Sequence, residues 1–367
     1  MANQVNGKSK KCQYEYNGRL CGRPLYDSEF CIFHSSNIEE KKAAFDMAFQ
    51  KEFERQKEKE EVFDFTGFIF PDSIDFFKGR DFSKDTYFVD AKFYGDKTDF
   101  FQAKFHKKAL FGDAQFLGKE VIFEAAIFKG EKTSFSDAKF SDKTTKTSFV
   151  RAGFLGEITK FIRTEFSCDR TDFDGAIFSG KERTFFQKTK FLGKEVSFNN
   201  SEFSSKTRFN AEFSGEVTSF KDTKFLEFID FRGIKFNCKI VNFEDTIFKT
   251  HYIDFSKSEF DCEEINFHNV KFLRGNYSFE QTHFKAKKSI EFHHVKFGGG
   301  DHKFIGTKFE GKKLSFEGSR FECTDKANFE GARFNSDEII RKRQTNCIPN
   351  KRRTGLMVGV WIVIKGG

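Results

Sequence analysis

Phenylalanine recurs along most of the chain with one spacing. Between residues 65 and 334, two Phe residues lie five positions apart, and about seven positions separate each pair from the next. The residue two positions before the second Phe of a pair is usually small, such as Ala103 or Thr164. The repeat predicts one short element copied many times along the chain. Typical pairs are Phe100/Phe105, Phe123/Phe128, Phe161/Phe166, Phe243/Phe248, Phe267/Phe272 and Phe316/Phe321.

The five-residue spacing excludes a single regular element for each unit. Two residues five apart face opposite sides of a strand, and on an α-helix they lie about 140° apart. The chain must therefore turn between the two Phe residues for both rings to share one interior. The small residue two positions before a Phe shares its face in an extended segment. Each unit is thus interpreted as two very short extended segments, which are too short for the strands of a hairpin sandwich.

Repeated turning in one sense predicts an all-β solenoid. Phe can stack on Phe only if one coil holds a whole number of units. One unit of about 12 residues encloses too little room for two rings, whereas two units give four sides and about 24 residues. We therefore expect about 11–12 coils, a length of roughly 55 Å and a core of stacked Phe rings.

The repeat resembles that of the pentapeptide-repeat family, whose unit places a small residue two positions before a central Leu or Phe. Ala103-Lys-Phe105 and Ala176-Ile-Phe178 carry this resemblance, which covers roughly residues 63–334. It implies a right-handed quadrilateral parallel β-helix. The average step here is six residues instead of five, so every second side is expected to carry a longer corner. Longer gaps after four Phe residues predict loops, and the short unit at Phe209/Phe213 is expected to bend the rod; the gaps follow Phe140, Phe178, Phe284 and Phe321.

Four zinc-competent side chains precede the repeat. Cys12, Cys21, Cys31 and His34 have the spacing C-x8-C-x9-C-x2-H, and zinc favours four thiolate and imidazole ligands. Some pentapeptide-repeat proteins look similar here, with a Cys-rich module that ends in Cys-Ile-Phe-His. We predict one structural zinc, because four protein ligands leave no open position for catalysis. The alternative is three unrelated thiols and a histidine.

The segment between the cysteines and the repeat is predicted to be a helix. Residues 37–61 place Phe45, Phe49 and Phe53 on one stripe, and Asn37 is expected to cap the helix together with Glu40. The helix is expected to cover the open core of the first coil; docking of a partner helix is the alternative. The predicted organisation is then a Cys3His module (1–36), a capping helix (37–62), the β-helix (63–334) and a basic tail (335–367).

Composition and charge support this organisation. Phe accounts for 57 of the 367 residues, and Pro for only three. The formal charge of +8 belongs largely to the tail, since residues 62–334 sum to only about +3. Six basic residues precede the apolar stretch 355–364, which is too short to span a bilayer but suits weak contact with an anionic membrane. A disordered tail is the alternative; the basic residues are Arg341, Lys342, Arg343, Lys351, Arg352 and Arg353.

The repeat carries no motif of a catalytic site or a nucleotide-binding site, so we predict that the protein is not an enzyme. If two units form a coil, Glu244, His268, His293 and Glu317 form an outward column that either binds a cation or is an ordinary solvated surface. The remaining cysteines occupy corner positions, where we expect free thiols. Two of them, Cys238 and Cys262, lie one coil apart and are expected to stack; the other two are Cys168 and Cys323.

The function most consistent with these features is a non-enzymatic scaffold or protein-interaction rod, with the tail as a candidate for holding it at a membrane surface. The start of the chain lacks an apolar leader, which favours a cytoplasmic protein. The alternative comes from family members that mimic DNA, inhibit type II topoisomerases and confer quinolone resistance. A DNA mimic must be strongly acidic, and this body is near neutral. Nucleic-acid binding is not predicted, because no local run of basic residues forms a stripe. The partner and the oligomeric state are left open.

Overall fold

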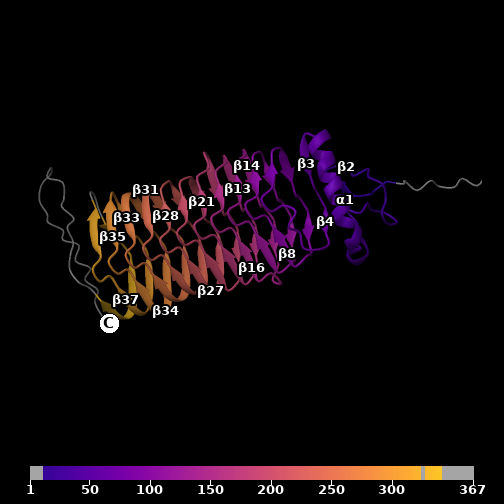
Figure 1. Ribbon diagram of the computed structural model, residues 1–367. Helices are drawn as coiled ribbons and strands as arrows, with labels where there is room; N and C mark the ends of the chain where they lie inside the picture. The colour runs from indigo at the N-terminus through magenta and orange to yellow at the C-terminus, as the bar shows by residue number, and fades with distance from the viewer. Residues whose placement is uncertain (1–10, 324–326, 341–367) are drawn as a thin grey trace, which may run out of the picture.

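A computed structural model describes residues 11–323 and 327–340. The chain forms a small N-terminal module, one helix and a long parallel β-solenoid of about 11 coils (Figure 1). The module contains the hairpin strands β1 (Glu15–Tyr16) and β2 (Arg19–Leu20), and helix α1 (Ile38–Lys59) follows it. The solenoid then extends to residue 340. The expected basic and apolar tail, residues 341–367, lies outside the described residues.

The strands of the solenoid form two extended sheets of 21 and 17 strands. The 21-strand sheet contains β3 (Val62–Asp64), β5 (Asp81–Phe82), β6 (Asp85–Tyr87), β9 (Lys104–Phe105), β10 (Ala109–Leu110), β13 (Ile127–Phe128), β14 (Lys132–Ser134), β17 (Gly153–Phe154), β18 (Ile158–Lys160), β21 (Ile177–Phe178), β22 (Arg183–Phe185), β25 (Glu202–Phe203), β26 (Lys206–Arg208), β28 (Lys224–Phe225), β29 (Ile229–Asp230), β31 (Ile247–Asp254), β33 (Lys271–Ser278), β35 (Lys296–Gly299), β36 (His302–Lys303), β38 (Arg320–Cys323) and β39 (Ala327–Asn328). The 17-strand sheet contains β4 (Ile69–Phe70), β7 (Lys92–Phe93), β8 (Lys97–Asp99), β11 (Gln115–Phe116), β12 (Glu120–Ile122), β15 (Lys139–Phe140), β16 (Lys146–Ser148), β19 (Glu165–Phe166), β20 (Arg170–Asp172), β23 (Lys190–Phe191), β24 (Glu195–Ser197), β27 (Glu212–Ser219), β30 (Lys235–Asn242), β32 (Glu259–Asn266), β34 (His283–Glu291), β37 (Lys308–Ser315) and β40 (Arg333–Ile340).

The strand register confirms that two Phe units make one coil. Phe93 lies opposite Phe116, and Phe116 lies opposite Phe140, always in parallel strands. Each partner is therefore the second Phe of the next unit but one, as the repeat predicted. In space the paired rings stack directly, with centroids 4.8 Å apart between Phe93 and Phe116 and 4.6 Å apart between Phe116 and Phe140.

The Phe rings form four columns along the rod. Within one column Phe100, Phe123 and Phe149 stack at 4.7 Å and 5.0 Å, and their ring planes differ by only 4°. Rings of neighbouring columns meet edge to face, as Phe111 and Phe123 do at 5.5 Å and 89°. These are the two geometries that aromatic pairs favour. All four rings are fully buried, so the core is a continuous aromatic lattice.

A tight turn separates the two Phe residues of each unit. In the unit of Phe100, the amide of Ala103 donates to the carbonyl of Phe100 at 3.0 Å, and Gln102 has φ 55°. A positive φ at the third residue is typical of a type II turn. This turn brings both Phe side chains into one interior, as the five-residue spacing required. The residue that follows it must be small because it points into the crowded core; Ala103 is fully buried.

The strands of the C-terminal half are longer than expected. Up to β26 the strands contain two or three residues, whereas β27, β30, β31 and β32 each contain eight and span two sides of the coil. In the N-terminal half a glycine turns this corner, and a Cβ on Gly118 would lie 1.9 Å from the carbonyl oxygen of Gly95. Cys238 and Cys262 stand at the equivalent corner later in the chain, where the backbone runs extended. The size of the corner residue does not decide the strand length, since Gly215 lies inside the eight-residue β27 and Cys168 separates the short strands β19 and β20.

Helix α1 covers the N-terminal end of the solenoid, as predicted (Figure 1). Phe49 packs edge to face on Phe70 at 5.3 Å, and Phe53 stacks on Phe63 at 4.9 Å. The expected capping box is absent: Asn37 occupies the N-cap position, but its side chain makes no capping bond. In the described part of the chain, no helix combines the length and the apolar character needed to cross a membrane.

Candidate metal centre

Two short turns and a hairpin bring the N-terminal ligand candidates together. The β1–β2 hairpin returns the chain so that the amide of Cys12 donates to the Arg23 carbonyl at 2.8 Å, and the amide of Cys21 donates to the Tyr14 carbonyl at 2.8 Å. A single turn then places Cys31 beside His34, whose amide donates to the Cys31 carbonyl at 3.0 Å. Backbone pairing thus positions all four side chains without a hydrophobic core of their own.

The four ligand atoms form a compact cluster. The Sγ atoms of Cys12, Cys21 and Cys31 and a ring nitrogen of His34 all lie within 4.8 Å of one another. The Sγ atoms of Cys21 and Cys31 are 3.8 Å apart, and His34 Nδ1 lies 3.3 Å from Cys31 Sγ and 3.4 Å from Cys12 Sγ. A tetrahedron with Zn–S bonds of about 2.3 Å has S–S edges of about 3.8 Å. The cluster therefore has the dimensions of a tetrahedral site and can hold a metal ion.

The surroundings of His34 orient its ring toward the three sulfurs. Nε2 donates to the carbonyl oxygen of Thr66 at 3.1 Å, which leaves Nδ1 as the ligand atom. Tyr14 stacks on the imidazole with ring centroids 4.0 Å apart and planes 16° apart. A backbone carbonyl on the second nitrogen is the usual support of a metal-binding histidine. Because Thr66 belongs to the first coil, this bond also attaches the module to the solenoid.

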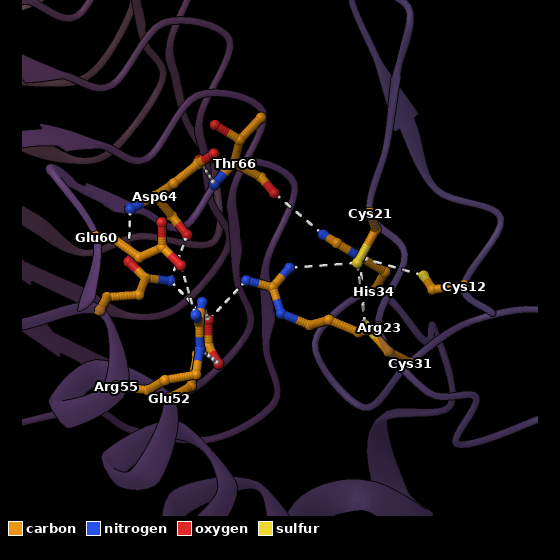
Figure 2. Close-up of polar contacts among 11 residues, drawn as sticks. Cys12, Cys21, Arg23, Cys31, His34, Glu52, Arg55, Glu60, Asp64 and Thr66 are labelled. Carbon is orange, nitrogen blue, oxygen red and sulfur yellow. Dashed lines mark hydrogen bonds and ion pairs between the residues drawn. The ribbon is translucent and has the colours of Figure 1, made fainter. Parts of the chain in front are cut away.

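Arg23 connects the cluster to the capping helix (Figure 2). Its Nη1 donates to Cys21 Sγ at 3.2 Å, and its Nη2 donates to Glu52 Oε1 on α1 at 2.7 Å. Burial raises the pKa of Glu52, but hydrogen bonds from Arg55, Gln56 and Arg23 outweigh it and lower that pKa to about 2. Three thiolates and one neutral imidazole around a divalent ion would carry a net charge of −1, which the Arg23 guanidinium would offset.

A hydrogen bond from Cys31 favours the thiolate of Cys21. This bond is the main cause that lowers the pKa of the Cys21 thiol, against burial and with further help from His34 and Arg23. Thiolates are the form in which cysteine binds metals. The same hydrogen bond raises the pKa of the Cys31 thiol, so the metal-ligating role is supported by the geometry of the four donor atoms.

The histidine column forms in space but does not gather its donor atoms. The rings of His268 and His293 lie 6.0 Å apart, as expected for neighbours one coil apart. Glu244 is held by Lys221 at 3.1 Å, on the preceding coil. Within the described residues, the cluster of Cys12, Cys21, Cys31 and His34 is the one group of three or more donors close enough to share an ion. The column is therefore a feature of the surface and not a site with converging donor atoms.

The expected stacking of corner cysteines is present. Cys238 Sγ lies 3.7 Å from Cys262 Sγ, and both are buried. Cys168 instead contacts the hydroxyl of Thr171 at 3.2 Å. All three are free thiols. Their positions agree with structural corner residues.

Sequence reasoning missed the residues that support the cluster. Nothing in the sequence indicates that Arg23 contacts Cys21, or that Thr66 accepts from His34, since both contacts depend on how the module docks. The chain matches no family model, no curated protein and no solved structure in the comparisons made. The geometry of the described residues is therefore what supports a metal centre.

Proposed function

We propose that the protein is a non-enzymatic scaffold of the pentapeptide-repeat type, with one structural zinc in its N-terminal module. The observation that carries the metal proposal is the cluster of four ligand atoms within 4.8 Å. With four protein ligands the site is closed, so its role is to fold the module and attach it to the solenoid. The scaffold proposal is supported by the solenoid itself, a rigid rod with a large regular surface.

The family proposal is supported by details of the coil. Each coil contributes one Phe ring to each of the four columns. A small residue such as Ala103 lies two positions before the second Phe of a unit. The longer average step of six residues distinguishes this chain from the five-residue pattern of the family. The proposal includes a cytoplasmic location and weak membrane contact through residues 341–367, which lie outside the described part of the chain.

Elemental analysis and X-ray absorption test the metal proposal. Purified protein should contain one zinc per chain, with three sulfurs at about 2.3 Å and one nitrogen at about 2.0–2.1 Å. Cys12→Ser should lose the metal, whereas Cys262→Ser, which removes a thiol from the solenoid, should keep it. Circular dichroism of the sheets should survive chelation, because the Phe core is independent of the metal. Zinc-free wild-type protein would contradict the proposal.

Affinity capture tests the scaffold proposal. The full chain and a chain that lacks residues 341–367 should both retain the same specific partner from lysate of the native cell, if the partner binds the described part. A partner retained by the full chain alone would assign recognition to the tail. No enrichment over a control bait would contradict the scaffold role.

A further inference from the structure

Basic residues that are far apart in the sequence line up on one face of the 21-strand sheet. Lys132 lies opposite Ile158, Ile158 opposite Arg183, and Arg183 opposite Lys206. Each step is about 25 residues in sequence but one strand spacing of about 4.8 Å in space. The row therefore cannot be recognised from residues that are adjacent in the sequence. A second row, two residues later on the same strands, contains Lys160.

The side chains of both rows point outward. The residues between the rows, such as Thr159 and Thr184, are buried in the core, whereas Arg183 and Lys206 are exposed. Alternation along a strand then places the second row on the same outer face. Lys132 and Lys160 are half-buried.

Four cations of this face have no carboxylate partner among the described residues. Within the described residues, Lys132, Lys160, Arg183 and Lys206 form no ion pair, unlike Lys108, which pairs with Glu131 at 3.1 Å. Burial and then the positive charges of Lys160 and Lys108 lower the pKa of Lys132. Glu131 acts on Lys132 in the opposite sense, so the face combines unpaired cations with nearby carboxylates and is basic along its two rows.

Aromatic side chains continue the same two rows. Lys160 Nζ lies 6.0 Å from the ring centroid of Phe185, which follows it in the second row. In the first row Lys206 is followed by Phe228 and then Tyr252, because the next residues pair as Thr207 with Ile229 and Ile229 with Ile253. The rings of Phe228 and Tyr252 are stacked, with centroids 6.0 Å apart and planes 11° apart.

Aromatic rings on this surface contrast with the rest of the solenoid. The paired Phe residues of the core, such as Phe186 and Phe209, are fully buried. Tyr252, in contrast, is 36% exposed, and Phe185 and Phe228 are half-buried. From Lys132 to Tyr252 the first row crosses five strand spacings, or about 24 Å.

A hollow adjoins the second row at its C-terminal end. It has a volume of about 390 Å³, and most of its lining groups are hydrogen-bond donors. One carboxylate lies in it, Asp230, which pairs with Arg232 at 2.7 Å. The lining residues are Gln187, Arg208, Asn210, Asp230, Arg232 and Lys257.

We propose that this basic–aromatic face, formed by Lys132, Lys160, Arg183, Phe185, Lys206 and Phe228, binds single-stranded nucleic acid. A positively charged track with exposed rings is how proteins hold single strands, because cations contact phosphates and the rings stack on unpaired bases. Duplex bases are already stacked inside the helix and leave the rings without a partner, and an acidic peptide offers the charge but few planar groups. The inference goes beyond the proposed function, since it needs neither the metal nor a protein partner.

The sequence predicted no nucleic-acid contact because basic residues adjacent in sequence form no stripe. The coil register supplies the stripe from residues about 25 positions apart. The sequence around one lysine does not show which residue lies beside it on the next coil. That residue can be identified only when the length of each coil is known. That length varies along this chain: 26 residues separate Lys132 from Ile158, and 23 separate Arg183 from Lys206.

Fluorescence anisotropy with labelled (dT)15 and (rU)15 tests the proposal on the full chain. The triple variant Lys132→Gln/Arg183→Gln/Lys206→Gln should weaken binding at least tenfold and reduce the slope of log K against log salt by about 2, since each phosphate contact on a single strand contributes about 0.7. The matched variant Lys92→Gln/Lys139→Gln/Lys190→Gln removes the same charge from the 17-strand sheet and should change binding less than twofold.

The ring contribution is tested separately. Phe185→Leu/Phe228→Leu keeps an apolar side chain on the face and should weaken binding about tenfold with an unchanged salt slope, because stacking on bases is lost but phosphate contacts remain. Melting temperatures identify any variant that has lost its fold. Cys12→Ser should bind as the wild type does, so failure of the zinc proposal leaves this one standing.

Four results would overturn the proposal. The first is no binding of either oligonucleotide at low salt. The second is an equal loss in both triple variants, which would indicate general attraction or contact by the tail. The third is tighter binding of a 15-bp duplex together with no effect of the Phe variants. The fourth is tighter binding of polyglutamate than of oligonucleotide with the same loss in the face variant, which would assign the face to an acidic protein.

Discussion

At the scale of single residues, the stability of the solenoid comes from Phe rings that each stack on the equivalent Phe of the preceding and the following coil. Phe243 stacks on Phe220 at 4.9 Å and on Phe267 at 4.8 Å, and it is fully buried. Removal of one ring therefore leaves a cavity bounded by flat faces that cannot easily collapse, because the backbone of each coil is held by hydrogen bonds to the coils on both sides.

Phe243→Ala is expected to lower the free energy of unfolding by about 3–5 kcal/mol, through lost burial and the residual cavity. Denaturant titration followed by circular dichroism measures the change. Leu192→Ala is the matched control: Leu192 is 41% exposed, so its truncation should cost about 0.5 kcal/mol or less. An effect below about 1 kcal/mol for Phe243→Ala would mean that the ring lattice does not carry the fold.

His302 replaces an aliphatic residue in the core and makes stability pH-dependent. It follows Ile253 and Tyr277 in one inward column, stacks on Tyr277 at 4.9 Å and is fully buried. Burial lowers the pKa of His302 to about 4, from about 6.5 in an unfolded chain. Between these values the unfolded chain binds the proton more readily, so acid favours unfolding.

The contribution of His302 should therefore leave the free energy of unfolding unchanged above about pH 6.5. It should lower that free energy by up to about 3 kcal/mol as the pH decreases toward 4. Urea titrations at several pH values measure this loss. The variant His302→Ile introduces the residue type that this column has two coils earlier, at Ile253, and should lose less stability over the same interval. Parallel pH profiles for wild type and variant would show that His302 is not the group responsible.

The sequence predicted the small residue of each unit but not its second role. From Thr164 onward the small residue is often Thr or Ser, and its hydroxyl donates to a Phe carbonyl one coil earlier: Thr223 to Phe198 and Thr246 to Phe220, each at 2.7 Å. Spacing shows which residue faces the core, because alternation is local. It does not show the acceptor, which lies about 25 residues earlier in the chain.

At the scale of elements, α1 is completed by groups from the solenoid. Lys84, from the first coil, donates through Nζ to the carbonyls of Gln56, Lys57 and Glu60 at 3.0, 2.6 and 2.6 Å. The Gln56 carbonyl also accepts from the amide of Glu60, and Lys57 contributes one of the carbonyls that the end of a helix leaves without partners. A cation at this end also interacts favourably with the helix dipole.

Lys84→Met should destabilise the cap by about 1–2 kcal/mol, because it removes both the charge at the helix C-terminus and the hydrogen bonds to its carbonyls. Hydrogen exchange of the α1 amides measures this, and the last turn should exchange faster while the amides of β31 remain protected. Lys92→Met is the control, since Lys92 forms no ion pair within the described residues. Equal exchange in both variants would contradict this role.

The limits of α1 illustrate what the pattern could and could not predict. The stripe of Phe45, Phe49 and Phe53 predicted the helix and its buried face, and the observed bounds, Ile38–Lys59, differ from the expectation by one or two residues. The expected cap by Asn37 failed because its side chain makes no capping bond there. The cap at the other end comes from Lys84, which only the docked structure reveals.

At the scale of the whole molecule, the repeat predicted the core better than the surface. The core depends on spacing within one unit, which the sequence shows directly. The surface depends on which residues of successive coils align, and coils of different lengths shift that alignment. The cluster of three cysteines and one histidine lies between these cases. Its four candidate ligands were predicted by type and spacing, whereas its attachment through Arg23 and His34 is visible only in the docked module.

The charge of the whole rod leads to the last prediction. Residues 62–334 sum to about +3, whereas a B-form duplex of about 55 Å carries roughly 32 negative charges at one per 1.7 Å. The outer surface also bears the unpaired cations of the basic–aromatic face, so this face of the rod does not resemble DNA. We therefore expect no binding of the protein to DNA gyrase in the absence of DNA, measured by biolayer interferometry at low salt. An acidic protein of similar size serves as the control for nonspecific attraction to the basic cleft of the enzyme. Specific, saturable binding by this protein that weakens as salt rises would contradict the expectation and return a topoisomerase-directed role to consideration.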